Sequence, residues 1–267
     1  MNTRELTGRV ALVTGVTRRA GIGAAIAREL ARAGAQLFVT SFRHYDQRQS
    51  WGIGHDEPES ILAELATIAD AAVGLELDLS RPHAPAELFG QALQRFGRVD
   101  ILVNNAAHWE AGTITDVDGS QLDRHYAVNV RAPVLLCAEF ARHKTSDGPG
   151  RIVNLTSGQN QHPMPGELAY AVTKSAVDAL TLTLSAELAG RGITVNAIDP
   201  GPTDTGWISD ELRATLTRDS PEGISSPETI GRLVRWLASD AAAAVNGRVI
   251  QAQATATKTL LFPTTTR

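Results

Sequence analysis

The sequence has a single cysteine, Cys137, in 267 residues, so no disulfide can form within the chain. It has no apolar run near the ~20 residues of a membrane-spanning helix, and its first residues lack the apolar stretch of a signal peptide. Basic residues are in slight deficit, because 25 Lys and Arg stand against 29 Asp and Glu. We therefore predict a cytoplasmic protein that has neither a nucleic acid nor a membrane as a partner.

The sequence also lacks any cluster of His, Cys, Asp and Glu with metal-ligand spacing, so no metal site is predicted. No repeat or linker divides the chain, and its length is common for one α/β domain. We predict a catalytic domain over residues 1–254, which includes a substrate lid at about 205–226. A threonine-rich tail follows over residues 255–267.

What is present is a regular alternation of short β-branched runs with helical periodicity. This order predicts an α/β fold with a doubly wound parallel sheet of about seven strands and helices on both faces. A polar segment at 44–60 is longer than most connections and predicts a loop or flap. The predicted strands are 10–13, 37–40, 75–77, 99–103, 151–155, 194–198 and 245–251, and the predicted helices are 22–33, 87–96, 122–142, 169–188 and 227–239.

A glycine-bearing turn lies between the first strand and the first helix, with the sequence TGVTRRAGIG over residues 14–23. Glycines let the backbone approach a pyrophosphate closely, and the helix N-terminus offers N–H donors. Glycines also serve ordinary turns, but this position, after a strand and before a helix, indicates a dinucleotide site.

The end of the second strand bears on the choice of cofactor. A carboxylate there would favour NAD, but the chain has Ser41, with Arg43 close by and Arg18 and Arg19 in the turn. Cations and a hydroxyl suit a 2′-phosphate, so we favour NADP(H) and keep NAD(H) as the alternative. Asp78 follows the third strand and is either an adenine ligand or a turn residue.

Four polar residues suggest acid–base chemistry. Tyr170 and Lys174 are four apart on a predicted helix, so both side chains can face the same space. A neighbouring cation is expected to lower the pKa of the phenol. Ser157 ends the fifth strand and can hydrogen-bond a substrate oxygen, while Asn129 can hold a water behind Lys174. Each residue alone has an ordinary structural explanation, but the ordered combination favours catalysis.

These motifs together resemble those of the short-chain dehydrogenases/reductases, over about residues 8–247. The resemblance rests on the glycine turn, the Asn104-Asn105-Ala106 segment, the catalytic residues and Pro200-Gly201. It implies a single-domain Rossmann fold, and a homo-oligomer that is a tetramer or a dimer. It also implies that Tyr170 is the general acid in reduction and that Lys174 binds the nicotinamide ribose.

The resemblance further implies that Ser157 polarises the carbonyl, Asn129 supports a proton relay and Asn104 steadies the sheet. Pro200, Gly201 and Thr205 would seat the nicotinamide. The full set of cofactor-binding residues expected is Gly15, Thr17, Arg18, Arg19, Gly21, Ile22, Gly23, Ser41, Arg43, Asp78, Leu79, Asn105, Ala106, Ala107, Tyr170, Lys174, Pro200, Gly201, Thr203 and Thr205.

Three features depart from the family pattern. The turn has five residues between Gly15 and Gly21 where three are usual, and Ala107 stands where the family has glycine. The usual acidic-Gly-Gly ending after the last strand is replaced by QAQAT at 251–255. The last change weakens what the resemblance implies about subunit contacts and the pocket edge.

Substrate contacts are expected from loops after the fourth and fifth strands and from the lid. Trp207, Leu212 and Leu216 offer the lid an apolar face, although ordinary helix packing explains the same pattern. The candidate substrate residues are His108, Trp109, Gln159, His162 and Trp207.

The leading functional prediction is an NADPH-dependent ketoreductase of a small-molecule carbonyl, similar to 3-oxoacyl-carrier-protein reductases and their secondary-metabolism relatives. One alternative is an NAD(P)-dependent dehydrogenase that oxidises a sugar, sterol or cyclic alcohol. Another class of function is a cofactor-binding sensor or scaffold without turnover, which the intact set of Ser157, Tyr170 and Lys174 disfavours.

Overall fold

Seven parallel strands form the central sheet of the computed structural model, which describes residues 4–144, 148–208, 213–214 and 223–252. Their order is β3-β2-β1-β4-β5-β6-β7, and every neighbouring pair is parallel. The predicted doubly wound fold is thereby confirmed. The strands are β1 (Val10–Val13), β2 (Gln36–Ser41), β3 (Ala72–Glu76), β4 (Ile101–Asn104), β5 (Gly150–Leu155), β6 (Ile193–Asp199) and β7 (Val249–Gln251).

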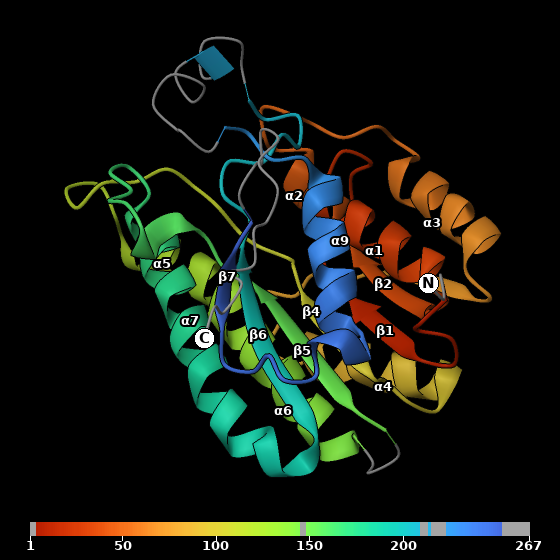
Figure 1. Ribbon diagram of the computed structural model, residues 1–267. Helices are drawn as coiled ribbons and strands as arrows, with labels where there is room; N and C mark the ends of the chain where they lie inside the picture. Colours follow the sequence, from red (N-terminus) through yellow and green to blue (C-terminus); the bar gives the residue numbers. More distant parts are fainter. Residues whose placement is uncertain (1–3, 145–147, 209–212, 215–222, 253–267) are drawn as a thin grey trace.

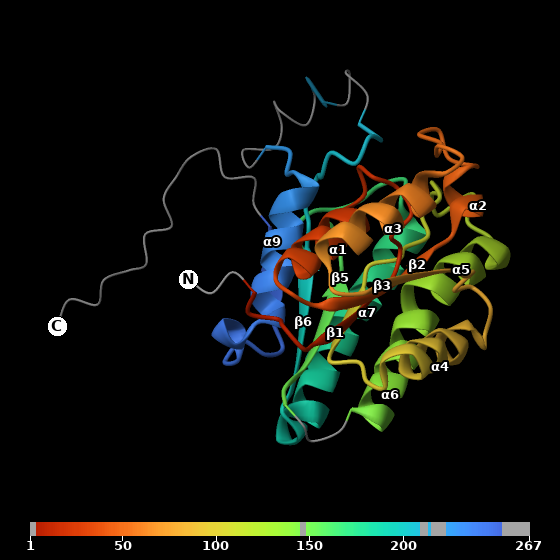
Figure 2. The ribbon, with the colours of Figure 1, turned by 90° about the vertical axis from the view of Figure 1, so that its right-hand side faces the viewer.

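Helices cover both faces of this sheet (Figures 1 and 2). One face carries α1 (Ile22–Arg32), α3 (Glu57–Ile68) and α9 (Pro227–Ala238). The other carries α4 (Ala84–Phe96), α6 (Ala132–His143) and α7 (Leu168–Leu188). Three short helical turns are also present: η2 (Gly158–Asn160), η3 (Ala189–Arg191) and η4 (Asp240–Ala242).

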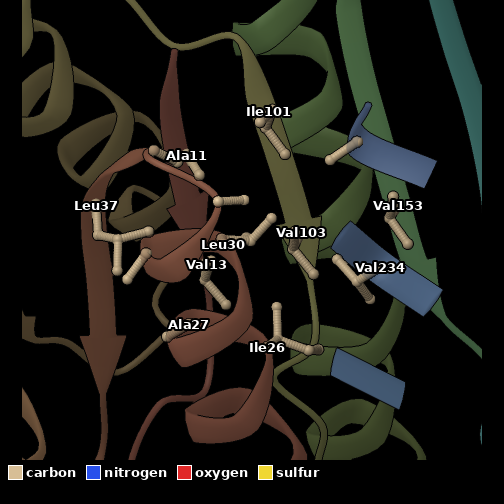
Figure 3. Close-up of a cluster of buried hydrophobic side chains, with 14 of the residues drawn as sticks. Ala11, Val13, Ile26, Ala27, Leu30, Leu37, Ile101, Val103, Val153 and Val234 are labelled. Carbon is tan, nitrogen blue, oxygen red and sulfur yellow. The ribbon is translucent and has the colours of Figure 1, made fainter. Parts of the chain in front are cut away.

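The two hydrophobic cores follow from the alternation of side chains along each strand. Ala11 and Val13 of β1 point to the α1 and α9 side, where Figure 3 shows them near Leu30. Leu12, between them, packs in the core beneath α4 and α6. Both sheet faces are thus buried, which explains why the strands are continuous apolar runs in the sequence.

The strand order places a switch point beside β1. The chain runs outward from β1 to β2 and β3, and then returns to place β4 on the other side of β1. In open parallel sheets a ligand crevice forms where this reversal occurs, at the carboxyl ends of the strands. The glycine turn after β1 and the segment after β4 therefore border the same crevice.

The prediction of a loop over residues 44–60 is wrong in part. A short helix, α2 (Arg43–Asp46), follows β2, and α3 begins at Glu57. Pro58 lies in the first turn of α3 with the acidic residues Glu57 and Glu59, which favour a helix N-terminus. The polar residues of this segment predicted a loop in the sequence, because their charges hide the helical periodicity of the residues that follow them in α3.

The long helix predicted over 122–142 is instead interrupted. It consists of α5 (Gly119–Tyr126), a π-helical turn η1 (Ala127–Arg131) and α6. Asn129 lies in the π turn, a feature common at functional sites. The last strand is also shorter than predicted, because residues before Val249 form a turn with Gly247 at φ +70°.

Much of the predicted lid and all of the predicted tail lie outside the described residues. The lid residues concerned are 209–212 and 215–222, which include Leu212 and Leu216, and the end of the predicted domain at 253–254 lies outside as well. Within the described ranges no helix is both long and apolar enough to cross a membrane. Among those same residues no group of three or more His, Cys, Asp or Glu is placed to hold a metal ion.

Candidate active site

The glycine turn packs tightly against the end of β4. Gly15 has φ +75°, and a Cβ added there would lie 2.8 Å from Ala106 Cα. A Cβ on Gly23 would lie only 2.3 Å from the Gly15 carbonyl oxygen. Glycine is therefore required at both positions if the turn and the first turn of α1 are to approach each other.

Two side chains bind this turn to the strand beside it. Asn105 Nδ2 donates to the carbonyl oxygens of Thr14, at 2.8 Å, and Gly15, at 3.1 Å. Thr14 Oγ1 in return accepts from the N–H groups of Asn105 and Ala106, each at 3.0 Å. These bonds fix the crevice wall before any ligand binds.

A cavity of about 330 Å³ lies along this wall. Helix α1 points its N-terminus at it, with no side-chain cap and no acidic residue in its first turn, so the turn's N–H groups suit an anion. The residues present therefore fit a dinucleotide pyrophosphate. The predicted cofactor residues that line the cavity are Gly15, Thr17, Arg18, Gly21, Ile22, Gly23, Ser41, Asp78, Leu79, Asn105, Ala106, Ala107 and Thr205.

Two of the predicted arginines lie off this cavity. Arg43 pairs with Glu76, Nε to Oε2 at 2.8 Å, and also with Glu59. Arg19 Nη1 donates to Glu64 at 2.9 Å. Their carboxylate partners come from β3 and α3, which the sequence order alone does not place beside them.

Arg18 does line the cavity, but three partners hold its guanidinium. Its Nε donates to Asp46 Oδ1 at 2.9 Å, and its Nη1 donates to the Thr205 carbonyl at 2.7 Å. Its Cζ lies 5.2 Å from the centre of the Trp51 ring, a cation–π distance. Arg18 therefore connects the glycine turn, the α2 region and the start of the lid.

The three residues proposed for proton chemistry meet beyond this cavity. Ser157 and Tyr170 line the same cavity wall, and the neighbouring Ser157 hydroxyl acts to lower the pKa of the Tyr170 phenol. Burial acts in the opposite direction and is the larger influence, so the pKa of Tyr170 is raised above its ordinary value. The prediction of a lowered pKa is thus wrong for this structure, and Tyr170 is held as a neutral phenol able to donate a proton.

Lys174 lies beneath Tyr170, with Nζ 5.5 Å from the centre of the phenol ring. Its Nζ donates to the Leu155 carbonyl at 2.7 Å, and the residue is 3% exposed. Burial lowers the pKa of this ammonium to about 8. Its charge is therefore costly in the folded chain.

Asn129 fastens the segment after β4 to the helices behind it. Its Oδ1 accepts from the His108 N–H at 2.7 Å, and its Nδ2 donates to the His108 carbonyl at 2.9 Å. Nδ2 also donates to Thr173 Oγ1 at 3.1 Å. Both N–H groups are thereby used, so a water relay has only Oδ1 of this side chain available. Asn104 similarly donates to Asn154 Oδ1, at 2.8 Å, in the centre of the sheet.

A second cavity, of about 560 Å³, adjoins the first and shares Ile22, Tyr45, Ala107 and Thr205 with it. Ser157 and Tyr170 line it, so proton chemistry and a substrate space coincide. Predicted residues for the nicotinamide and substrate also line it, namely Pro200, Gly201, Thr203, Trp109, His162 and Trp207.

Two candidate substrate residues are placed elsewhere. Gln159 is not on the wall of the second cavity, because its Nε2 donates to Asp178 at 2.7 Å and to Thr156 at 3.2 Å. His108 lines the first cavity instead, and its Nε2 bonds Glu110 at 2.9 Å. Burial lowers the pKa of His108, which favours the neutral ring.

The sequence did not predict that residues in and just after α2 line the two cavities. Tyr45 and Trp51 line the second cavity, and Arg48 lines the first. The available signal was the presence of aromatic residues in an otherwise polar segment, since exposed loops seldom need large rings.

The comparisons with known proteins identify the family of this chain. The family model described as Enoyl-(Acyl carrier protein) reductase matches residues 15–254. An uncharacterized oxidoreductase of Bacillus subtilis is 41% identical over 248 residues, which cover 92% of this chain and 95% of the relative.

The chain belongs to the short-chain dehydrogenase/reductase family.

Two other members of this family are informative. The NADPH-dependent aldehyde reductase-like protein of Arabidopsis thaliana is 34% identical, over 92% of this chain and 93% of that protein. A short-chain dehydrogenase from Burkholderia cenocepacia, solved in complex with NADP, is 30% identical with a TM-score of 0.83 and covers 94% of this chain and 98% of that one. The predicted family is thereby confirmed. It is a family of oxidoreductases, and the fold is Rossmann-like.

Proposed function

We propose that this chain is an NADP(H)-dependent ketoreductase, which reduces a small-molecule ketone or aldehyde to an alcohol. The observation that carries the proposal is that Ser157 and Tyr170 together line a cavity that adjoins the dinucleotide crevice. A proton donor and a hydroxyl that polarises a carbonyl then face the same substrate atom.

The reaction assigns a distinct task to each side chain. The nicotinamide, when bound, would supply the hydride for the new C–H bond at the carbonyl carbon. Ser157 holds the carbonyl oxygen, and Tyr170 transfers its phenolic proton to that oxygen as the C=O bond becomes a C–O bond. Lys174 would bind the ribose of the cofactor and stabilise the phenolate that remains, while Asn129 positions the wall at His108. The raised pKa keeps Tyr170 protonated, so the phenol carries the proton that reduction requires.

The preference for NADP(H) rests on the adenosine end of the first cavity. Ser41, not a carboxylate, ends β2 there, and Arg18 and Arg48 line the same cavity. Arg48 is exposed and gives only its Nε to the His44 carbonyl, at 3.2 Å. We assign to Arg48 the role first predicted for Arg43, because a 2′-phosphate needs an accessible cation. The relative described as NADPH-dependent and the neighbour bound to NADP support this choice.

The test is a steady-state panel of ketones, secondary alcohols and a 2-enoyl thioester, each with NADP(H) and NAD(H). The proposal expects reduction of ketones with NADPH to have the highest kcat/KM. Arg48→Ala should raise the KM for NADPH by about 10- to 100-fold, the worth of a charge-assisted hydrogen bond. The matched control Arg43→Ala should change it less than about twofold, because Arg43 lies off the cavity.

Each rival function has its own outcome in this panel. Preference for alcohols with NAD would favour a dehydrogenase of a sugar, sterol or cyclic alcohol, and reduction of the thioester's C=C bond would favour an enoyl reductase. Cofactor binding without turnover of any compound would favour a sensor or scaffold. Any of these results would contradict a ketoreductase.

We also propose a cytoplasmic homo-oligomer, a dimer or tetramer, that forms through the α5–α7 side. Large apolar side chains are exposed on these helices, and a subunit interface would bury them. Light scattering in solution tests this assembly. The residues are Leu122, Tyr126, Val134, Val172 and Leu182.

A further inference from the structure

The β2–α3 segment, residues 42–56, crosses from the end of β2 to the start of α3 and contains α2 (Figures 1 and 2). Its residues reach both cavities. Tyr45 lines the two of them, and Trp51 lines the second, together with Tyr170. This segment therefore forms part of the substrate wall, whereas the proposed function uses only its Arg48, at the cofactor.

Tyr45 is fixed by the segment that follows β4. Its hydroxyl accepts from the Trp109 N–H at 3.0 Å and donates to the Trp109 carbonyl at 3.3 Å. Burial raises the pKa of Tyr45 to about 12, so the phenol stays neutral and both bonds persist at ordinary pH. The ring is thereby held at the boundary between the two cavities.

Trp51 is held by an equally specific set of contacts. Its Nε1 donates to Asp46 Oδ1 at 3.0 Å, the same oxygen that accepts from Arg18 Nε at 2.9 Å. Asp46 is 7% exposed, so this carboxylate is a built anchor and not a solvated charge. The Arg18 guanidinium over the indole completes the anchor.

The second cavity is aromatic and poor in charge. Five Tyr and Trp rings line it together with His162, and its volume of about 560 Å³ lies within the usual range for small-molecule sites. Among the described residues on its wall no Lys or Arg occurs, and the one carboxylate, Glu167, accepts from Trp109 Nε1 at 2.8 Å. The rings are those of Tyr45, Trp51, Trp109, Tyr170 and Trp207.

We propose that the β2–α3 segment is a specificity element and that the substrate is a neutral ketone with a flat, fused-ring body, which packs against Trp51 and Tyr45. This inference rests on the proposed ketoreductase function. Flat rings gain stacking and dispersion energy on indole and phenol faces, whereas an anionic body finds no Lys or Arg among the described residues of the wall.

The experiment compares 2-tetralone, a fused-ring ketone, with ethyl 3-oxobutanoate, a linear one, in NADPH-driven reduction. The unmodified protein should have the higher kcat/KM for 2-tetralone. Trp51→Leu should lower that value about tenfold, equal to the ~1.4 kcal/mol of a lost aromatic contact. Its effect on the linear ester should stay within about twofold, and Trp51→Phe should restore most of the loss.

Trp236→Leu is the matched control, because Trp236 is a 39% exposed tryptophan on α9 that lines neither cavity. It should change no kinetic constant. An equal loss for both ketones in Trp51→Leu, or a preference of the unmodified protein for the linear ester, would overturn the inference.

A binding measurement separates this inference from the function on which it rests. Titration calorimetry of 2-naphthol, an unreactive fused ring, into protein saturated with NADP⁺ should show binding that Trp51→Leu weakens about tenfold. If 2-naphthol binds in this way but no ketone is reduced, the proposed ketoreductase function fails and the ring site stands. If ketones are reduced but Trp51→Leu binds 2-naphthol normally, the ring site fails.

Discussion

Replacement of Asn129 by alanine removes a side chain that supports the wall between the two cavities. The Asn129 amide satisfies both backbone groups of His108 and is itself 1% exposed. In Asn129→Ala the His108 N–H and carbonyl lose these partners, and the smaller side chain offers no replacement. Helix geometry should be kept, because alanine is a good helix former.

The structure sets the size of this effect. Each buried polar group left without a partner costs about 1–3 kcal/mol, so two such groups give a loss of about 2–6 kcal/mol in the free energy of unfolding. For a domain of this size the same loss lowers Tm by on the order of 10 °C. The activity should fall as well, because the displaced segment carries Ala107 and Trp109 on the cavity walls.

Urea unfolding and calorimetry measure the loss directly. Thr173→Val is the control, because it removes one acceptor of the Asn129 amide and leaves both His108 bonds in place. Its cost should be about 1 kcal/mol. If Asn129→Ala costs less than about 0.5 kcal/mol, or no more than Thr173→Val, then Asn129 does not fasten the wall as described.

Gly23→Ala should weaken NADPH binding more than tenfold in calorimetry, because the added Cβ meets the Gly15 carbonyl oxygen at 2.3 Å. Gly90→Ala on α4, where nothing lies within 4 Å, should keep full affinity, and full affinity in Gly23→Ala would contradict the packing argument. Lys174 has a folded-state pKa of about 8, below its ordinary value of 10.5, so the unfolded chain binds the extra proton between these pH values. Over that window the stability of the wild type should rise with pH relative to Lys174→Met in urea unfolding, and parallel curves would refute the lowered pKa.

Local patterns in the sequence predicted most of the backbone elements that carry the site. Strand β1, the glycine turn and α1 follow one another within about 20 residues, so spacing alone placed Gly15 and Gly23 on the crevice. Tyr170 and Lys174 share one helical face for the same reason. These features depend on backbone periods that the sequence displays directly.

Partners from distant elements could not be predicted in this way. Arg43 is taken up by Glu59 and Glu76, and the loss of that cation from the crevice follows only from how α3 and β3 pack. Gln159 turns to Asp178, 19 residues further along the chain. The pKa of Tyr170 likewise depends on burial, which no spacing reveals.

The position of Trp51 in the site was likewise not predicted from the sequence. Its segment was expected to be a polar loop, yet Asp46 and Arg18 hold the indole on the wall of the second cavity. A contact between the glycine turn and α2 requires the folded arrangement of β1 and β2. The sequence therefore predicted Trp109, His162 and Trp207 on the substrate side, but only the tertiary structure places Tyr45 and Trp51 there.

The most direct test of the proposed chemistry is the single-turnover rate of hydride transfer in Tyr170→Phe. The variant keeps the ring and loses only the hydroxyl, and the rate is followed by loss of NADPH absorbance with the best ketone of the panel. The account predicts a fall of about 10²–10⁴-fold, the worth of a general acid, with NADPH affinity unchanged. A rate near that of the wild type would contradict it, because Tyr170 would then not be the proton donor.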